Sequence, residues 1–120
     1  MLLYVMNGYE EGKFIELSDN VVKLGRSHSM DQDGLINQIV LAYDREISGN
    51  HGRFFQKNGL WFIEDMNSRH GTFVDEIKLS SPLEIKPGNV IRVGRTLLLV
   101  CQDRNNIPKM AVMSLSINKN

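Results

Sequence analysis

The chain has 120 residues, of which 42% are hydrophobic and 23% charged, and 14 basic side chains balance 14 acidic ones. This length predicts one domain with a single core. The composition excludes global disorder, and the charge balance lacks the basic excess that nucleic-acid binding requires. The single cysteine, Cys101, cannot form an internal disulfide, which favours a cytoplasmic location. Residues 1–6 are apolar but too few for a signal peptide or a membrane span, so we expect no direct membrane contact.

Short runs rich in Val, Ile, Phe and Leu follow one another along the chain, bounded by Gly, Pro, Asn, Asp or Ser, and they predict β-strands. The runs comprise residues 2–6, 13–17, 21–24, 38–42, 52–56, 60–65, 72–74, 77–79, 83–85, 90–93 and 97–100. Lys57-Asn58-Gly59 is the clearest hairpin, because Asn-Gly suits the two positive-φ positions of a type I′ turn. Polar stretches at 26–37, 43–50 and 66–71 are predicted to be loops. Roughly ten short strands without an amphipathic helix predict an all-β sandwich or barrel.

Residues 102–120 are predicted to be a tail that follows a domain at 1–101. Residues 102–108 are polar and have no regular period. Beyond them, Met110, Met113 and Ile117 fit one face of a helix, whereas Met113, Leu115 and Ile117 fit a strand equally well. The tail is therefore a short helix, a short strand or the start of a linker.

Five fragments stand at strand ends in a fixed order. They are residues 22–26 (Val-Lys-Leu-Gly-Arg), 37–41 (Asn-Gln-Ile-Val-Leu), 47–51 (Ile-Ser-Gly-Asn-His), 65–74 (Asp-Met-Asn-Ser-Arg-His-Gly-Thr-Phe-Val) and 85–94 (Ile-Lys-Pro-Gly-Asn-Val-Ile-Arg-Val-Gly). Each fragment is common alone, but the order and spacing resemble the forkhead-associated (FHA) domain family over about residues 2–101. The resemblance implies an FHA-type β-sandwich of eleven mainly antiparallel strands. It also implies that loops at one end bind phosphothreonine in a protein partner, without catalysis and without a cofactor.

The resemblance assigns roles to individual residues of these loops. Arg26 matches the arginine that binds the phosphate, and a guanidinium suits that role because its fixed donors form strong charge-assisted bonds. Ser48 matches the serine whose hydroxyl donates to the phosphate, and Arg69 matches a second position that often reaches the phosphothreonine. Structural support is implied for four further residues, Gly25, His51, Gly71 and Thr72.

Two positions depart from the family pattern. His70 stands where the family usually has an Asn that binds the peptide backbone, and neutral imidazole also has one donor and one acceptor. Gly49 follows Ser48, at a position where the family commonly has a long polar side chain. The phosphate contact of that side chain is therefore lost, and the backbone N–H of Gly49 is a partial replacement. Ser27 and His28 lie beside Arg26 and are candidates to supply that contact instead.

These departures keep an alternative open, in which a degenerate FHA domain binds an unphosphorylated protein or helps to assemble a complex. The first loop also carries Asp31 and Asp33, which either repel a phosphate or select basic residues in a peptide.

Enzymatic and metal-binding functions are disfavoured. Ser48, His51 and Asp65 are the residue types of a catalytic triad, but no nucleophile motif or oxyanion hole accompanies them. The soft metal-ligand candidates lack ligand spacing. They are His28, His51, His70 and Cys101.

Overall fold

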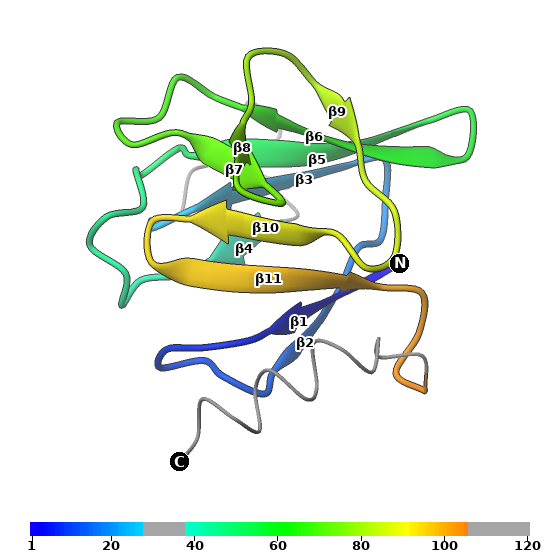
Figure 1. Ribbon diagram of the computed structural model, residues 1–120, viewed down its shortest axis with the longest axis horizontal. Coiled ribbons are helices and arrows are strands. Elements are labelled where there is room, and N and C mark those ends of the chain that lie inside the picture. Colours follow the sequence, from blue (N-terminus) through cyan, green and yellow to red (C-terminus); the bar gives the residue numbers. More distant parts are fainter. Residues whose placement is uncertain (28–37, 106–120) are drawn as a thin grey trace.

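The computed structural model describes residues 1–27 and 38–105, which form two β-sheets packed face to face (Figure 1). The six-stranded sheet has the order β2 (Phe14–Glu16), β1 (Leu2–Val5), β11 (Thr96–Cys101), β10 (Val90–Val93), β7 (Thr72–Val74), β8 (Ile77–Lys78). The five-stranded sheet has the order β4 (Gln38–Val40), β3 (Val21–Gly25), β5 (Gly52–Lys57), β6 (Leu60–Asp65), β9 (Leu83–Glu84). The predicted all-β sandwich of eleven short, mainly antiparallel strands is therefore confirmed.

Every strand pair in the described residues is antiparallel except β3 with β4. In that parallel pair Leu24 lies opposite Ile39. Parallel neighbours need a long crossover connection, and the polar stretch after β3 supplies the length. The sequence did not reveal this parallel pairing, because strand direction depends on which strands become neighbours in space.

The core lies between the two sheets and follows from the alternation of side chains along each strand. Leu3 and Val5 of β1 are fully buried, as are Phe54 of β5 and Ile63 of β6. Ile47 is also fully buried, although it belongs to the connection between β4 and β5. A loop residue that packs in the core holds its loop against the sandwich.

Two tight turns contain positive-φ residues. Asn58 (φ 54°) and Gly59 (φ 78°) join β5 to β6, which confirms the predicted hairpin turn. Asp75 (φ 49°) and Glu76 (φ 68°) join β7 to β8 without a glycine. The Asp75 carboxylate accepts hydrogen bonds from Val90 N at 2.9 Å and Asn89 Nδ2 at 2.8 Å. Asp tolerates the left-handed region, and these bonds fix the turn.

Four connections gather at one end of the sandwich, on the left of Figure 1: β1–β2, β4–β5, β6–β7 and β10–β11. The β5–β6 hairpin and the N-terminus lie at the opposite end. Residues 102–105 follow β11, and the predicted helix or strand beyond them lies outside the described residues. Across residues 1–27 and 38–105, no helix is long and apolar enough to cross a membrane.

Candidate functional site

Gly25 allows the β4–β5 loop to pack against the end of β3. The Arg26 N–H donates to the Ser48 carbonyl at 3.0 Å, and the Leu41 N–H donates to the Gly25 carbonyl at 2.9 Å. A Cβ atom at Gly25 would stand 1.9 Å from the Gly49 carbonyl oxygen. Close passage of the backbone, rather than a positive φ, is therefore the reason for a glycine at this position.

Asp44 fixes the same loop to the β10–β11 hairpin. Its Oδ1 accepts from the Glu46 N–H at 3.0 Å. Its Oδ2 accepts from the Arg95 N–H at 2.8 Å and from Thr96 Oγ1 at 2.7 Å. Sequence reasoning missed Asp44, although an Asp that bonds the backbone two residues later is a common turn device.

His51 joins the β4–β5 loop to the β6–β7 loop. Its side chain is 0% exposed, with Nδ1 3.1 Å from the Ser48 N–H and Nε2 2.9 Å from the Gly71 carbonyl oxygen. Nδ1 must accept and Nε2 must donate, which assigns the neutral Nε2–H tautomer. Burial lowers the pKa of His51, although the Gly71 carbonyl and the Asp65 carboxylate oppose this effect. The ring is therefore held neutral between the loops.

Asp65, at the end of β6, organises the β6–β7 loop. Its Oδ1 accepts from Ser68 Oγ at 2.5 Å and from Thr72 Oγ1 at 2.7 Å, and its Oδ2 accepts from the Ser68 N–H at 3.0 Å. Ser68 Oγ in turn accepts from the Gly71 N–H at 2.9 Å. Partial burial acts to raise the pKa of Asp65, but the hydrogen bonds from Ser68 and Thr72 outweigh it and lower the pKa. Thr72 and Gly71 thus belong to the framework of the loop.

The side chains of Arg26 and Arg69 meet at one backbone oxygen. Arg26 Nη1 lies 3.3 Å and Arg69 Nη2 3.5 Å from the Arg45 carbonyl oxygen. The Arg69 N–H donates to Ser48 Oγ at 2.9 Å. A hydroxyl that accepts this bond keeps its own O–H for another acceptor. The structure therefore brings together Arg26, Ser48 and Arg69, which come from three separate loops.

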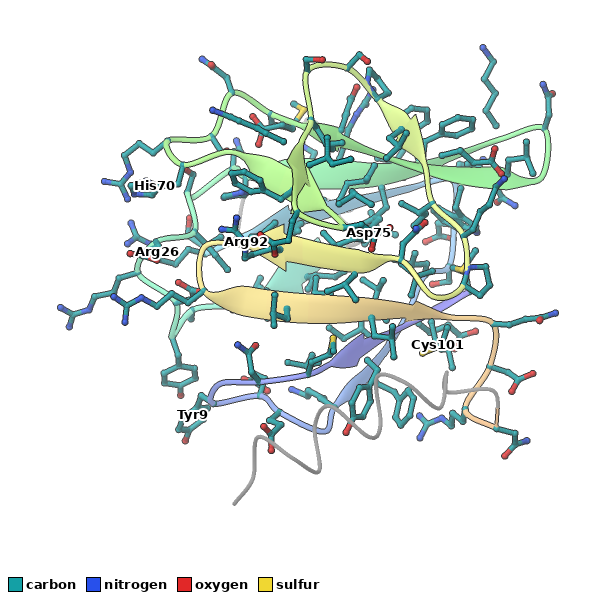
Figure 2. All side chains as sticks on the ribbon, in the orientation of Figure 1. Tyr9, Arg26, His70, Asp75, Arg92 and Cys101 are labelled. Atoms are coloured by element: carbon teal, nitrogen blue, oxygen red, sulfur yellow. The ribbon has the colours of Figure 1, made fainter. Side chains whose placement is uncertain are left out.

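The remaining predicted contact residues lie around this group. Ser27 is exposed, and its Oγ lies 3.1 Å from the place where a Gly49 side chain would begin. His70 is exposed in the β6–β7 loop, at the same end of the sandwich as Arg26 (Figure 2). Three residues of the first loop, His28, Asp31 and Asp33, lie outside the described residues.

Positive charge prevails in the loops that carry Arg26, Ser48 and Arg69 and in the neighbouring β10–β11 turn. The described parts of these loops and the β10–β11 turn carry four arginines (Arg26, Arg45, Arg69, Arg95) and two carboxylates (Asp44, Glu46). Glu46 Oε2 pairs with Arg95 Nε at 3.3 Å. Within residues 1–27 and 38–105, neither Arg26 nor Arg69 forms an ion pair with a carboxylate. An anion such as a phosphate is the natural partner of two converging guanidinium groups.

The geometry offers no catalytic triad among Ser48, His51 and Asp65. His51 Nδ1 contacts the Ser48 backbone N–H, while Ser48 Oγ receives the Arg69 N–H instead. The Asp65 oxygens bond to Ser68 and Thr72. A working nucleophile needs a hydrogen bond to its base, and the described bonds do not provide one. In the same part of the chain, no three His, Cys, Asp or Glu side chains are grouped to hold a metal ion.

Comparisons with known proteins agree with this architecture. The family model for the FHA domain matches residues 22–94. The chain is 29% identical to the FHA domain-containing protein FhaB of Mycobacterium tuberculosis over 96 residues, which cover 80% of this chain and 57% of FhaB. It therefore spans little more than half the length of this curated relative.

Two solved structures show the same fold. An FHA domain of a hypothetical Arabidopsis thaliana protein superposes with a TM-score of 0.70 at 28% identity, over 83% of this chain and 82% of that one. A domain studied for phosphothreonine-dependent FHA domain interactions superposes with a TM-score of 0.67 at 24% identity, over 85% and 95% of the two chains. The family model, the fold and the relatives agree, and the chain belongs to the FHA domain family.

Proposed function

We propose that the protein binds phosphothreonine in a protein partner through the loops that carry Arg26, Ser48 and Arg69, and that it acts by binding alone. One observation carries the proposal: the guanidinium groups of Arg26 and Arg69 both reach the Arg45 carbonyl, with Ser48 Oγ bonded beside them. Phosphothreonine-dependent interaction is documented for members of this family, which supports the assignment.

Electrostatics favour a doubly charged ligand at this position. Two guanidinium groups that share one neutral carbonyl repel each other, and a phosphate dianion relieves that repulsion. Each charge-assisted bond contributes about 1.5–3 kcal/mol. A phosphate that replaces the Arg45 carbonyl as acceptor gains shorter bonds than the 3.3 and 3.5 Å contacts of the free protein.

Ser48 and Ser27 are the hydroxyl donors that we propose for the phosphate beside the two arginines. The Arg69 N–H holds Ser48 Oγ in place, and the Ser48 O–H is then free to donate to a phosphate oxygen. Ser27 Oγ lies 3.1 Å from the position that a Cβ atom at Gly49 would occupy. Since Gly49 has no side chain, we propose that the Ser27 hydroxyl binds the phosphate in its place, with the Gly49 backbone N–H as a further donor. His70 is proposed to bind the peptide backbone through its ring nitrogens.

The test is a binding screen of the full chain with a degenerate phosphothreonine peptide library, alongside phosphoserine and unphosphorylated libraries. We expect phosphothreonine-specific binding that Arg26→Ala weakens by at least about tenfold, the equivalent of one charge-assisted bond. Arg104→Ala is the matched control, because Arg104 is exposed and follows β11, which ends away from these loops (Figure 1). Equal affinities for Arg26→Ala and Arg104→Ala would contradict the proposal.

A second comparison tests His70. If its imidazole binds the peptide backbone, His70→Ala weakens binding, whereas His70→Asn retains most of the affinity because an amide also has a donor and an acceptor. If a well-folded protein binds none of the phosphorylated libraries, the degenerate, phosphate-independent interaction module becomes the better account. Retrieval of a partner by both the wild type and Arg26→Ala would then support that account.

A reducing, cytoplasmic setting is part of the proposal. Cys101 is fully buried at the end of β11, and its burial raises the pKa of the thiol. A buried, protonated thiol is inert and behaves as a small apolar side chain. This residue supports the fold rather than the binding loops, and Figure 2 places it at the opposite end from Arg26.

A further inference from the structure

A second apolar cluster lies on the outer face of the six-stranded sheet, the face turned away from the core. Alternation along β11 separates the two clusters: Leu98 and Val100 belong to the core, whereas Leu99 and Cys101 point to the outer face. Figure 1 shows β1 and β11 side by side in this sheet. The outer cluster has three buried members and four partly buried neighbours, which are Met6, Leu99 and Cys101 with Leu2, Tyr4, Val90 and Leu97.

The strand register joins these side chains into one continuous apolar surface. Leu99 of β11 lies opposite Val90 of β10 on one side and Tyr4 of β1 on the other. Phe14 of β2 continues the row, and its ring centroid lies 5.1 Å from that of Tyr4. An antiparallel sheet that faces water usually carries polar side chains on that face. Apolar outer positions on four adjacent strands are instead typical of a surface that is covered by protein.

The burial along β11 indicates such a cover. Leu99 and Cys101 are both 0% exposed, although they stand on the outer face. On β1 the pattern is different, because Leu2 and Tyr4 of the outer face are only partly buried while the inward residues are fully buried. Within residues 1–27 and 38–105 every strand belongs to one of the two sheets, so no described strand lies over this face. The cover therefore has to come from elsewhere.

The described chain leads directly onto this face after β11. The guanidinium carbon of Arg104 lies 5.0 Å from the centroid of the Phe14 ring. Phe14 belongs to β2, which is separated from β11 by β1. Residues 102–105 therefore turn back from the end of β11 toward β1 and β2 on the outer side of the sheet. The residues that follow position 105 begin beside the apolar surface.

The C-terminal segment, residues 106–120, has the composition and the length to cover this surface. It contains no Asp or Glu, and its large apolar residues are Ile107, Met110, Val112, Met113, Leu115 and Ile117. Methionine side chains are flexible and fill irregular apolar surfaces well. The distance from β11 to β2 is two strand spacings, about 10 Å. A segment of 15 residues spans that distance as a helix or as a strand.

We propose that the C-terminal segment binds the outer face of β1, β2 and β11 of its own chain and covers Tyr4, Leu99 and Cys101. The segment is then an integral part of the domain rather than the start of a linker. It withholds an apolar surface from a second copy or another protein, and it leaves the loop end free for a partner. The inference does not depend on phosphothreonine binding, because Cys101 lies at the opposite end from Arg26 (Figure 2).

The experiment measures how fast the disulfide reagent dithiobis(nitrobenzoate) modifies the thiol of Cys101, the single cysteine, in the full chain. The double variant Met113→Asp/Ile117→Asp introduces charges at the two positions that the helical and the strand patterns share. We expect it to react at least about tenfold faster than the wild type, because burial of two large apolar side chains stabilises docking by more than that factor. The matched control is Ser114→Asp/Asn118→Asp, which adds the same charge outside both patterns and should react at the wild-type rate.

Three results would overturn the proposal. The first is a double variant that reacts at the wild-type rate, and the second is a wild-type thiol that reacts as fast as the urea-unfolded chain. The third is wild-type protection that disappears on dilution, which would identify a second copy as the cover. A measurement on the wild type alone guards against an unfolded variant: nuclear Overhauser contacts should join the methyl group of Met113 to those of Leu97 or Leu99. Their absence would refute the proposal.

Discussion

Replacement of His51 by alanine should destabilise the domain strongly, although His51 is one side chain beside a surface site. The ring is 0% exposed and satisfies two backbone groups, the Ser48 N–H and the Gly71 carbonyl. Each buried group left without a partner costs about 1–3 kcal/mol, so we expect a loss of about 2–5 kcal/mol in the free energy of unfolding. For a domain of this size each kcal/mol lowers Tm by about 4 °C, so that loss lowers Tm by roughly 8–20 °C.

The assay is urea unfolding monitored by circular dichroism, with a thermal melt of the same samples. His70→Ala is the matched control, because it removes an exposed histidine from the adjoining loop and should change the stability by no more than about 0.5 kcal/mol. His51→Gln should recover part of the loss, since an amide also has a donor and an acceptor. If His51→Ala costs less than about 1 kcal/mol, the two bonds to Ser48 and Gly71 do not hold the loops together as argued.

Three further outcomes follow from the same contacts. Because burial lowers the pKa of His51 in the folded state, the unfolded chain binds more protons below about pH 6.5, and stability should decrease as the pH falls through that value. Urea midpoints at pH 7.5 and 5.5 check this, and an equal decrease in His51→Gln would contradict it. Gly25→Ala should displace the β4–β5 loop, because the new Cβ atom would stand 1.9 Å from the Gly49 carbonyl oxygen. The amide resonances of the β4–β5 loop should therefore shift in an NMR spectrum of the variant. Shifts confined to the neighbours of residue 25 would count against this. Asp44→Ala should cost about 2–4 kcal/mol in urea unfolding, because two N–H groups and the Thr96 hydroxyl lose their acceptor; a change under about 1 kcal/mol would show that water replaces the carboxylate.

The strand pattern and one turn were accessible from the sequence because their causes are local. Alternation of side chains along runs such as residues 60–65 reflects one buried and one solvated face, and the period is visible within a few residues. Asn58 and Gly59 favour positive φ by their own chemistry. The turn at Asp75 and Glu76 lacks such a composition, and its φ values depend on bonds from Asn89 and Val90, which are fourteen and fifteen residues away.

The candidate site also has a part that the sequence indicated and a part that only the fold decided. The motifs around Arg26, Ser48 and Arg69 indicated the family and the loops, because the chemistry of a side chain is evident from its residue type. The sequence could not indicate the Arg45 carbonyl on which Arg26 and Arg69 converge, since every residue has a carbonyl and only the fold selects one. Residue types alone also made Asp65 a possible member of a triad, whereas the structure shows it fixing Ser68 and Thr72.

The strands, the Asn58-Gly59 turn and the family to which the chain belongs were thus readable from residue types and their order. The way in which the loops meet depended on the fold: His51 bonds to Gly71, which is 20 residues away, and Asp44 bonds to Thr96, which is 52 residues away. The fold also placed Tyr9, Tyr43 and Arg95 around one cavity. Local backbone preferences act over a few residues, whereas these contacts arise only after two sheets have packed and brought distant loops to one end.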